Sequence, residues 1–335
     1  RQATTAGAAE NNGSLDPVLA TEGNLNNDIG VPQMLLRLRQ HHRYAVIEMG
    51  MNHVGEISYL TQLAKPSIAL ITNAGAAHIE GLGSIEAVAR AKAEIFEGLD
   101  QQGTAIINAD DSYAPLWRKC AGSRPIIDFG LREKARVSAD YSTDPLMSTI
   151  QLKLPDGMET IQLQTPGVHN VYNALAAAAA TTALGIPKES IASGLECFRG
   201  VKGRMQKKLG LHHALLIDDT YNANPESVRA ALAVLASTKG KKILILGDMG
   251  ELGQSTVDLH RMIGKEARKA GLDKLLTLGE LSAYATAEFG KDAQHFNTLD
   301  ELLNATESLL ADDVTLLVKG SRFMQMERVV KQLEI

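Results

Sequence analysis

A glutamate followed by a glycine-rich turn is the most informative feature of this sequence. Residues 44–47 read as a strand, and Glu48 follows them directly. The turn that comes next carries Asn52, His53 and Glu56. In an open α/β sheet, chemistry collects beyond the carboxyl ends of the strands. A carboxylate placed there is well suited to hold a hard cation such as Mg²⁺.

A second predicted strand ends in the same way. Residues 68–72 are followed by Asn73, His78 and Glu80, whose side chains are compatible with a metal ion. Two such strand ends favour a nucleotide-dependent enzyme more strongly than either end alone. Taken by itself, His78 fits a hydrogen-bonded or exposed histidine better than a ligand, but its place after a strand, five residues past Asn73, makes a metal or phosphate role equally good. Lys92, in the helix predicted after this strand, fits a solvated lysine.

Three polar clusters follow predicted strands in the second half of the chain, at residues 218–225, 247–253 and 319–322. Each cluster alone is explained by the aspartate, asparagine and glycine that turns require. If the strands are parallel, all three share one edge of a sheet, and this favours a binding site. The Lys-Gly-Ser-Arg of residues 319–322, at the start of a helix, would offer an anion free amide N–H groups, a hydroxyl cap and two cations.

The start of an alanine-rich helix has two interpretations. Asn170 and Asn173 lie where the predicted helix 171–184 begins. An asparagine at such a place caps a helix N-terminus. The same amide can read the edge of an adenine, because it donates and accepts hydrogen bonds together. The residue types alone leave both interpretations open.

The elements that must position these side chains alternate in the first half of the chain. Strands are predicted at residues 44–48, 68–72 and 104–108, and helices at 57–63, 84–96, 171–184 and 190–197. Strands separated by helices indicate βαβ units and a parallel sheet. Two alternating runs at 149–154 and 158–163, joined by Pro-Asp-Gly, predict a hairpin at the edge of that sheet.

The second half of the chain predicts a smaller doubly wound domain of about 130 residues. Its strands are predicted at 214–217, 242–246, 274–278 and 314–318. Asn224 and Pro225 stand in the order of an N-cap and a first helical residue. The last helix is predicted to place Phe323, Met326, Val330 and Leu333 on one face. The fold class is therefore α/β: a mostly parallel central sheet with an antiparallel edge hairpin in residues 1–203, then a Rossmann-like domain in residues 204–335.

Composition and charge limit the class of protein. The chain has 335 residues, enough for two domains, and its 44% hydrophobic and 22% charged residues are ordinary for a globular protein. The net charge of −5 comes without a basic stretch, so no nucleic acid partner is expected. Cys120 and Cys197 are typical of reduced cytosolic thiols. The apolar run 174–184 is too short to span a bilayer and no signal peptide opens the chain, so a cytoplasmic protein is predicted, with residues 6–17 forming a loop.

Short motifs run in order along the chain, at residues 23–32, 48–56, 77–80, 91–96, 169–177, 203–204, 218–225, 247–253 and 319–322. From about Thr21 to the end, they resemble those of the Mur ligases of bacterial peptidoglycan synthesis. The segments 52–56 and 219–225 favour the branch of this family that adds a dipeptide over the branches that add a diamino acid or glutamate.

The resemblance implies an ATP-dependent peptide ligase in a cytoplasmic step of cell-wall synthesis, on which cell shape and cell division depend. ATP would phosphorylate the terminal carboxylate of a UDP-N-acetylmuramoyl-tripeptide, and the amine of D-alanyl-D-alanine would attack the acyl phosphate. Two anions must be placed together, so Mg²⁺ and cationic side chains are needed. The family implies a monomer without membrane insertion.

The resemblance also implies roles for single residues. Glu48, His78 and Lys92 would be metal ligands, with Lys92 carbamylated so that its added carboxylate bridges metal and phosphate. Asn27 would lie near the reacting carboxylate. The nucleotide would be held by Asn170, Asn173, Arg204, Asp219, Tyr221 and Asn222. The incoming dipeptide would be held by Asp248, Leu252, Lys319, Ser321 and Arg322.

One motif of the family does not occur in this chain. The Gly-x-x-x-x-Gly-Lys-Ser/Thr loop, which cradles the ATP phosphates in the family, is missing. The chain is therefore expected to be a fragment that holds the central and C-terminal domains, inactive or impaired by itself. Two other hypotheses stay open: a sister ligase that adds a single amino acid, and a non-catalytic relative that keeps the fold for binding.

Overall fold

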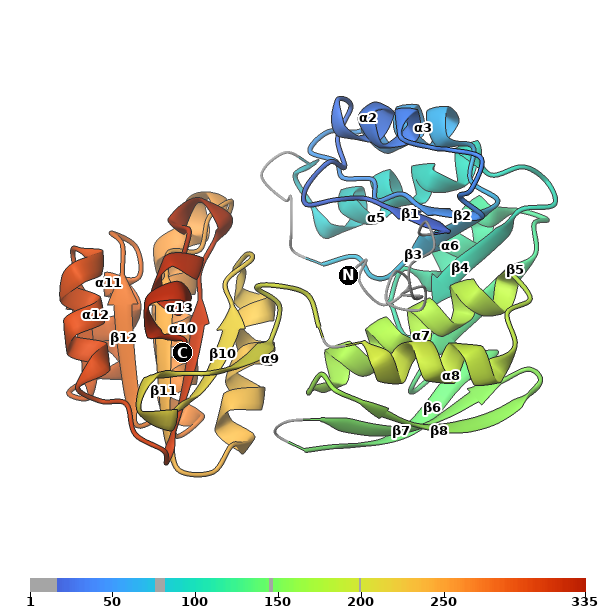
Figure 1. The fold of residues 1–335 in the computed structure, drawn as a ribbon. Coiled ribbons are helices and arrows are strands. Elements are labelled where there is room, and N and C mark those ends of the chain that lie inside the picture. Colours follow the sequence, from blue (N-terminus) through green and yellow to red (C-terminus); the bar gives the residue numbers. More distant parts are fainter. Residues whose placement is uncertain (1–16, 76–81, 145–146, 199) are drawn as a thin grey trace. The chain divides into compact units, whose positions relative to one another are not determined.

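The computed structural model describes residues 17–75, 82–144, 147–198 and 200–335, shown in Figure 1. The chain divides into two compact units. Unit 1 comprises Arg1–Ser142, Ser148–Gln164 and Val168–Phe198, and unit 2 comprises Thr143–Met147, Thr165–Gly167 and Arg199–Ile335. Each unit is built on a six-stranded sheet. The predicted α/β class is confirmed.

Unit 1 contains the strands β1 (Val18–Ala20), β2 (Tyr44–Val46), β3 (Ile68–Ile71), β4 (Thr104–Asn108), β5 (Ile126–Gly130), β6 (Val137–Thr143), β7 (Ser148–Leu154) and β8 (Gly157–Leu163). Its helices are α2 (Gly30–Leu36), α3 (Glu56–Ala64), α5 (Ile85–Ala93), the 3-10 helix η2 (Glu94–Gly98), α6 (Ala114–Ala121), α7 (Val168–Ala183) and α8 (Lys188–Cys197). The main sheet has the order β3-β4-β5-β6-β7-β8. It is parallel from β3 to β6, and β7 and β8 form the predicted antiparallel hairpin at its edge.

The strand before Glu48 pairs differently from the prediction. Strand β2 was expected in the central sheet, but it pairs in parallel with β1 as a separate two-stranded sheet. Strand β1 has three residues, too few to show an alternating pattern. The sequence analysis also missed β5, β6 and α6, and most of its predicted loop 6–17 lies outside the described residues.

Alternation along β4 explains why helices cover both faces of the main sheet. Ile106 packs in the core formed with α7 and α8, whereas Ala105 and Ile107 pack in the core formed with α5 and α6. Successive side chains of a strand point to opposite faces, so a strand buried on both sides is apolar throughout. Trp117 of α6 is fully buried in the second core and donates from its indole N–H to the Ala89 carbonyl.

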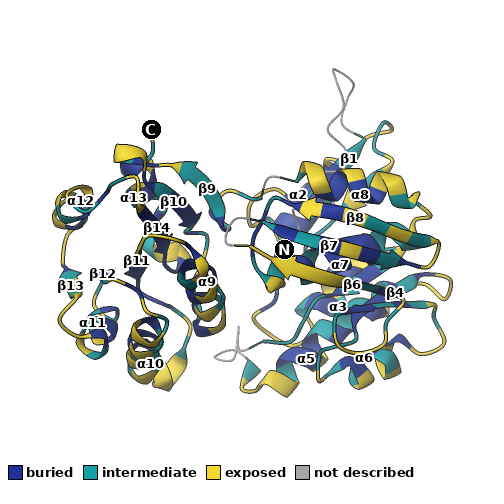
Figure 2. Cartoon of the chain, turned by 90° about the horizontal axis from the view of Figure 1, so that it is seen from below, coloured by how far each residue is buried: buried dark blue, intermediate teal, exposed yellow. Residues whose placement is uncertain are grey.

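Unit 2 contains the strands β9 (Gln206–Leu209), β10 (Leu215–Asp219), β11 (Lys241–Gly247), β12 (Lys274–Leu278), β13 (Ala293–Phe296) and β14 (Val314–Lys319). Its helices are the 3-10 helix η3 (Leu211–His213), α9 (Pro225–Ser237), the 3-10 helix η4 (Gly253–Ser255), α10 (Thr256–Lys269), α11 (Ala283–Phe289), α12 (Leu299–Glu307), the 3-10 helix η5 (Arg322–Met324) and α13 (Glu327–Leu333). The sheet order is β13-β12-β11-β14-β10-β9. All pairs are parallel except that of β9 with β10. Figure 2 shows the central strands coloured as buried and exposed residues on the helices around them.

The parallel strands β11, β14 and β10 are neighbours, so their three polar clusters share one edge as predicted. The predicted start of α9 is also confirmed, because Asn224 caps the helix and forms a capping box with Ser227. Strands β9 and β13, each of four residues, were missed. Within the described residues, no helix is long and apolar enough to cross a membrane.

The last predicted helix is partly wrong. The 3-10 helix η5 ends at Met324, its C-cap Gln325 has a left-handed φ of 49°, and α13 begins only at Glu327. Met326, Val330 and Leu333 are buried as predicted, but Phe323 is 63% exposed. The kink at Gln325 turns the first residues out of the helical face on which the prediction placed them.

Candidate active site

A cavity of about 1370 Å³ in unit 1 collects the first group of predicted site residues. Glu48, Lys92 and Asn27 all line it, together with residues of β2, β3 and α3. It therefore brings together the strand end at Glu48 and the helix that carries Lys92. His78, predicted as a third ligand, lies outside the described residues.

Glu48 is oriented from the segment that precedes α2. Its backbone N–H donates to the Thr21 hydroxyl at 2.9 Å. Its carboxylate Oε1 accepts a hydrogen bond from the Asn26 side-chain amide at 2.7 Å. The Gly50 N–H in turn donates to the Asn26 carbonyl at 2.7 Å, so the turn after Glu48 and residue 26 fix one another. The carboxylate stands in the cavity with its direction set by an uncharged partner.

Lys92 reaches the same cavity from the last turn of α5, a helix capped by the Ser84 hydroxyl. Its ammonium donates to the Asn73 carbonyl at 2.6 Å. Asn73 follows β3, so this bond ties Lys92 to the carboxyl end of that strand. A lysine placed in this way is not the freely solvated helix lysine that its residue type alone suggests.

Glu56, the acidic residue of the turn after Glu48, forms hydrogen bonds with the backbone of that same turn. Glu56 opens α3, and its carboxylate accepts from the backbone N–H groups of Asn52 at 2.6 Å and His53 at 3.1 Å. These bonds, the Asn52 one above all, hold the pKa of Glu56 below its ordinary value although burial opposes them. Asn27 acts similarly at α2, where its side-chain oxygen accepts from the Gly30 N–H at 2.8 Å. Both side chains organise helix starts that border the cavity.

The two asparagines predicted to hold adenine lie one helical turn apart in α7. The side-chain amide of Asn173 donates to the side-chain oxygen of Asn170 at 3.2 Å. Between them, Tyr172 donates from its hydroxyl to Asp110 at 2.6 Å. Asp110 also accepts from the backbone N–H groups of residues 131–133, so it ties the loops after β4 and β5 to the first turns of α7. Burial raises the pKa of Asp110, but the Tyr172 hydroxyl and these N–H groups outweigh it and hold the pKa below its ordinary value.

The edge of the unit 2 sheet brings together Asp219 and Lys319. These residues are register partners on β10 and β14. The Lys319 ammonium donates to Asp219 Oδ2 at 2.6 Å and to the Asn222 carbonyl at 2.9 Å. Its side chain is only 3% exposed, and that of Asp219 is 13% exposed. A cation in this position is neutralised by its own chain before any ligand binds.

Ser321 joins the three polar clusters. Its hydroxyl donates to the Ala223 carbonyl at 3.0 Å and accepts from the Gly250 N–H at 2.8 Å. Ser321 does not cap the turn that follows it, which differs from the predicted hydroxyl cap. Asp248 accepts from the Ser282 N–H at 2.7 Å, and a Cβ on Gly279 would lie 2.5 Å from its carboxylate, so that position requires glycine. The clusters are a single hydrogen-bonded unit.

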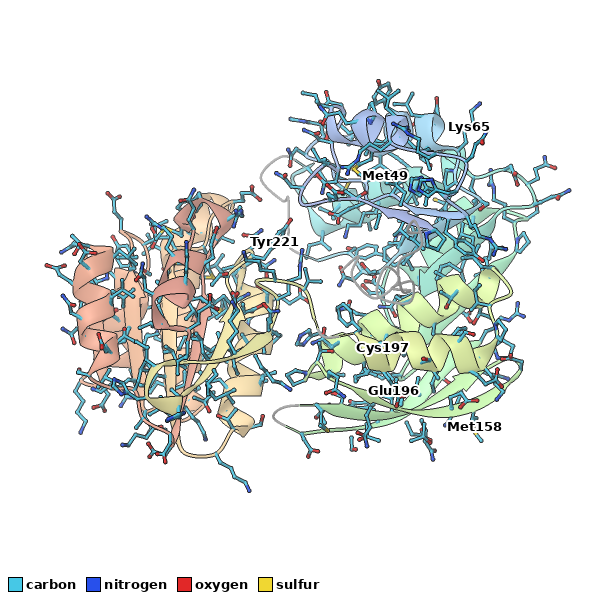
Figure 3. The ribbon with its side chains drawn as sticks, in the orientation of Figure 1. Met49, Lys65, Met158, Glu196, Cys197 and Tyr221 are labelled. Atoms are coloured by element: carbon cyan, nitrogen blue, oxygen red, sulfur yellow. The ribbon has the colours of Figure 1, made fainter. Side chains whose placement is uncertain are left out.

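Two cations at this edge stay near the surface. The Arg204 guanidinium lies 4.0 Å from the ring centroid of Tyr221, a residue labelled in Figure 3 just after β10. This is the geometry of a cation–π contact. Arg322 is exposed and donates to Glu327 at 2.8 Å. Leu252 is half-buried beside the Gly253 turn.

Asn26 and His260 are among the residues of this framework that were not found from the sequence. Asn26, which orients Glu48, belongs to the Asn-Leu-Asn-Asn run in which only Asn27 was singled out. His260, which contacts the backbone at Met249, stands in a helix eleven positions away without a neighbouring motif. Both act through contacts that only the fold creates.

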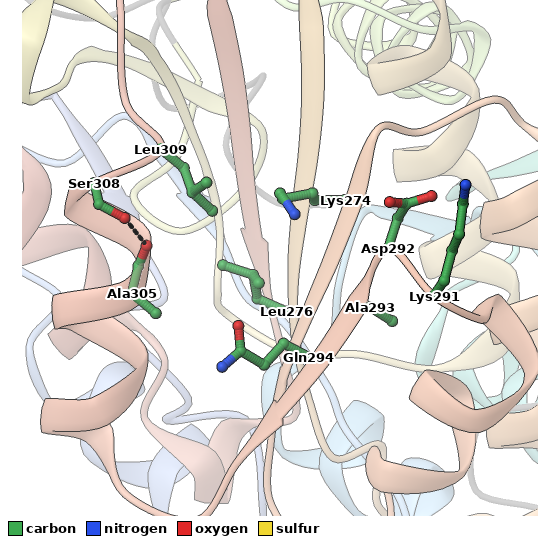
Figure 4. Close-up of a pocket in the computed structure, with 9 residues that line it drawn as sticks. All are labelled: Lys274, Leu276, Lys291, Asp292, Ala293, Gln294, Ala305, Ser308 and Leu309. Carbon is green, nitrogen blue, oxygen red and sulfur yellow. Dashed lines mark hydrogen bonds between the residues drawn. The ribbon is translucent and has the colours of Figure 1, made fainter.

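A smaller cavity in unit 2, of about 250 Å³, lies at the opposite end of the strands (Figure 4). It is lined by the starts of β12 and β13 and by the end of α12, with Lys274, Lys291 and Asp292 at its border. In parallel sheets, ligands bind beyond the carboxyl ends of strands, so this position does not indicate the site. Among the described residues, no three His, Cys, Asp or Glu side chains are grouped to hold a metal ion.

Comparison with known proteins bears on both units. The chain matches the family model of the Mur ligase middle domain over residues 3–181 and the model described as Mur ligase, glutamate ligase domain, over residues 203–322. It is 41% identical over 323 residues to the UDP-N-acetylmuramoyl-tripeptide–D-alanyl-D-alanine ligase of Escherichia coli strain K12, an alignment that covers 94% of this chain and 71% of the relative.

Solved structures agree with the sequence comparison. A crystal structure of MurF from Acinetobacter baumannii matches with a TM-score of 0.89 and 38% identity, covering 99% of this chain and 74% of that chain. The MurF ligase of Thermotoga maritima, solved in complex with ADP, shares the fold at a TM-score of 0.83 and 24% identity, over 94% of this chain and 72% of that one. The resemblance seen in the sequence is thus confirmed, and the chain belongs to the Mur ligase family.

Proposed function

We propose that this chain serves an ATP-dependent peptide ligase that joins D-alanyl-D-alanine to a UDP-N-acetylmuramoyl-tripeptide in peptidoglycan synthesis. The observation that carries the proposal is the 41% identity over 94% of the chain to a ligase of that name. The motifs at residues 48–56, 218–225, 247–253 and 319–322 lie at the carboxyl ends of β2, β10, β11 and β14, where α/β enzymes bind their substrates. We assign residues 1–203 to the middle domain and 204–335 to the C-terminal domain.

The reaction needs two substrates held for successive transfers. The γ-phosphoryl group of ATP passes to the tripeptide carboxylate, which releases ADP and leaves an acyl phosphate. The dipeptide amine then attacks the acyl carbon, loses a proton, and displaces phosphate as the amide forms. Positioning and charge stabilisation supply most of the catalysis in phosphoryl transfer. In unit 1, we assign these tasks to Glu48, His78, Lys92 and Asn27.

The donor set in unit 1 fits Mg²⁺. This ion takes oxygen ligands, and it is usually held by one or two carboxylates together with substrate phosphates rather than by a closed protein cage. Glu48 offers such a carboxylate in the cavity, and its one described side-chain partner is the uncharged Asn26. When bound, Mg²⁺ would neutralise phosphate charge, and Glu48, with His78 and a carbamylated Lys92, would hold it.

A carbamate on Lys92 is part of the proposal. The neutral amine would attack CO₂, form an N–C bond and lose a proton, which converts a cation into a carboxylate. Supplying ¹³C-bicarbonate to the chain should give a ¹³C carbamate resonance that Lys92→Arg removes. Lys119→Arg, at an exposed position of α6, is the matched control and should keep the resonance. A signal unaffected by Lys92→Arg would refute the assignment.

The remaining site residues are assigned either to the nucleotide or to D-alanyl-D-alanine. We assign Asn170 and Asn173 of unit 1, with Arg204, Asp219, Tyr221 and Asn222, to the nucleotide. Asp248, Leu252, Lys319, Ser321 and Arg322 are assigned to D-alanyl-D-alanine. The buried Lys319–Asp219 pair supports a role in fixing the two binding loops against each other. Arg322, which is exposed and paired with Glu327, is the more accessible cation for a dipeptide carboxylate.

Calorimetry with the full chain tests the function. Mg·ATP should bind, and Asn170→Ala should weaken this binding about tenfold or more, because a bidentate pair between an amide and a base contributes roughly 1–3 kcal/mol. Asn304→Ala, at an exposed helix position, is the control. D-alanyl-D-alanine should bind in preference to D-glutamate, L-lysine and diaminopimelate. Preference for one of these amino acids would favour a sister ligase, and binding of no nucleotide or dipeptide would favour a non-catalytic relative.

Location and assembly complete the proposal. Cys120 and Cys197 are free and exposed, as in proteins of reducing compartments, which supports a cytoplasmic enzyme. We expect a monomer, which light scattering would check.

A further inference from the structure

A buried histidine supports the second polar cluster of unit 2. His260 lies in α10 and is fully buried. Its Nε2 accepts a hydrogen bond from the Met249 N–H at 3.0 Å, and its Nδ1 lies 2.7 Å from the Thr256 carbonyl oxygen. The Met249 N–H can only donate and the Thr256 carbonyl can only accept. The neutral ring with its proton on Nδ1 is therefore the form that satisfies both partners.

Met249 is the middle one of three residues whose backbones are held. The Asp248 carbonyl accepts from the Ser321 N–H at 2.9 Å, and the Gly250 N–H donates to the Ser321 hydroxyl at 2.8 Å. Ser321 thus holds the two outer residues from β14's end, and His260 holds the middle one from α10. The next residue, Glu251, has a φ of 60°, which is uncommon for a residue other than glycine. A strained turn of this kind persists only when its surroundings fix it.

The environment of His260 keeps the ring in its accepting form. Burial lowers the pKa of His260 below its ordinary value, although the Thr256 carbonyl and the Asp248 carboxylate act in the opposite direction. A neutral ring keeps the Nε2 lone pair for the Met249 N–H, whereas an imidazolium would present a second donor to it. The chemistry that this histidine offers is thus acceptance of one backbone hydrogen bond.

We propose that His260 is a positioning residue for the dipeptide site: through the Met249 N–H it fixes Asp248, Gly250 and Leu252 in the arrangement that receives D-alanyl-D-alanine. The inference rests on the proposed function, in which Asp248 and Leu252 hold the dipeptide. His260 itself touches no substrate. Its effect is transmitted by one hydrogen bond to the backbone of the loop.

Two substitutions separate this role from simple packing. His260→Gln keeps an amide oxygen near the place of Nε2, whereas His260→Phe keeps a ring and removes the acceptor. In the full chain, His260→Phe should weaken D-alanyl-D-alanine binding about tenfold or more, and His260→Gln should stay within about threefold of the unchanged chain. Amide hydrogen exchange at residues 248–250 should be much faster in His260→Phe than in the unchanged chain, and only slightly faster in His260→Gln. ¹⁵N spectra of the unchanged chain should show the proton of His260 on Nδ1.

The outcomes are distinct. If His260→Phe lowers the melting temperature but leaves the dipeptide affinity of the folded chain unchanged, His260 only packs and the proposal is overturned. A proton on Nε2 would overturn it too. If the unchanged chain binds no D-alanyl-D-alanine, the proposed function fails instead, and exchange at Met249 still decides whether His260 fixes the loop.

Discussion

The two edges that carry the proposed site residues satisfy their polar groups in opposite ways. In unit 2, Lys319, Asp219 and Ser321 are buried or nearly so, and they bond to one another's loops. In unit 1, Glu48 and Lys92 line a cavity of about 1370 Å³. In unit 2, the side chains that we assign to the site also hold its loops together, whereas in unit 1 the assigned Glu48 and Lys92 border a cavity. Substitutions at the two edges should therefore have different effects on stability.

The largest effect on stability is expected for Lys319→Met. Removing the cation leaves Asp219 Oδ2 and the Asn222 carbonyl without their charged donor. Loss of one partner of a buried ion pair costs about 3–5 kcal/mol, because the remaining charge stays buried and unpaired. Urea unfolding followed by circular dichroism should show unit 2 melting early. The fluorescence of Trp117, the single tryptophan, reports the core of unit 1 and should keep its midpoint.

Lys241→Met is the matched control for this substitution. Lys241 pairs with Asp313 at 3.7 Å, but the two side chains are 63% and 52% exposed. Exposed pairs contribute about 0–1 kcal/mol, so this change should hardly move the unit 2 transition. Equal effects of the two substitutions would break the comparison, because they would mean that burial of the Lys319–Asp219 pair has no energetic consequence.

A smaller loss is expected for Ser321→Ala. The hydroxyl bridges the Ala223 carbonyl and the Gly250 N–H within a buried position, and alanine leaves both groups without a partner. An unsatisfied buried polar group costs about 1–3 kcal/mol. Ser308→Ala is the control, since the exposed Ser308 hydroxyl bonds only locally to the Ala305 carbonyl (Figure 4). A Ser321→Ala protein as stable as the Ser308→Ala protein would show that the three clusters do not act as one unit.

Tyr172 offers a test by pH in unit 1. Burial and the hydrogen bond to Asp110 raise the pKa of Tyr172 to about 12, with Arg132 acting in the opposite direction. The folded state therefore holds this proton more tightly than the unfolded state, whose tyrosine has a pKa near 10. The resulting stabilisation is complete below about pH 10 and is lost as the pH rises towards 12.

Tyr172→Phe removes that dependence. At neutral pH the substitution should cost about 1 kcal/mol for one hydrogen bond, since Asp110 keeps its backbone donors. Between about pH 10 and 12, the unfolding midpoint of unit 1, followed by Trp117 fluorescence, should fall less steeply in Tyr172→Phe than in the unchanged chain. Identical slopes would show that Tyr172 does not hold its proton through Asp110.

The strands and their polar ends were predictable because they are long enough to show a pattern. The strands β10, β11 and β14 have five to seven residues, each contains an apolar run, and each is followed by turn residues. The sequence alone does not show which residues that are distant along the chain lie next to each other in the fold. Lys319 and Asp219 are one hundred positions apart, and only the parallel register of β10 and β14 makes them partners. Lys319 was therefore predicted as an open cation, although the fold buries it.

Three of the missed strands share a physical cause. Strands β1, β9 and β13 have only three or four residues, and β9 and β13, unlike the equally short β3, contain polar residues in place of a continuous apolar run. Strand β2 was found, but its pairing with β1 depends on tertiary contacts that no local pattern encodes. Phe323 was placed on a helical face because periodicity does not register a single left-handed residue, Gln325, that interrupts the helix.

The smallest effect on stability is expected at the residue proposed for the metal. In Glu48→Gln, the side-chain oxygen can still accept from the Asn26 amide, and the Glu48 N–H bond to Thr21 is unaffected. The free energy of unfolding of unit 1, followed by Trp117 fluorescence, should therefore stay within about 0.5 kcal/mol of the value for the unchanged chain. Mg²⁺-dependent binding of ATP should nevertheless fall, since a neutral amide replaces the carboxylate. Asp140→Asn, at an exposed position of β6, should change neither property. If Glu48→Gln destabilised unit 1 as strongly as Lys319→Met destabilises unit 2, Glu48 would be a structural residue, and the contrast between the two edges would not hold.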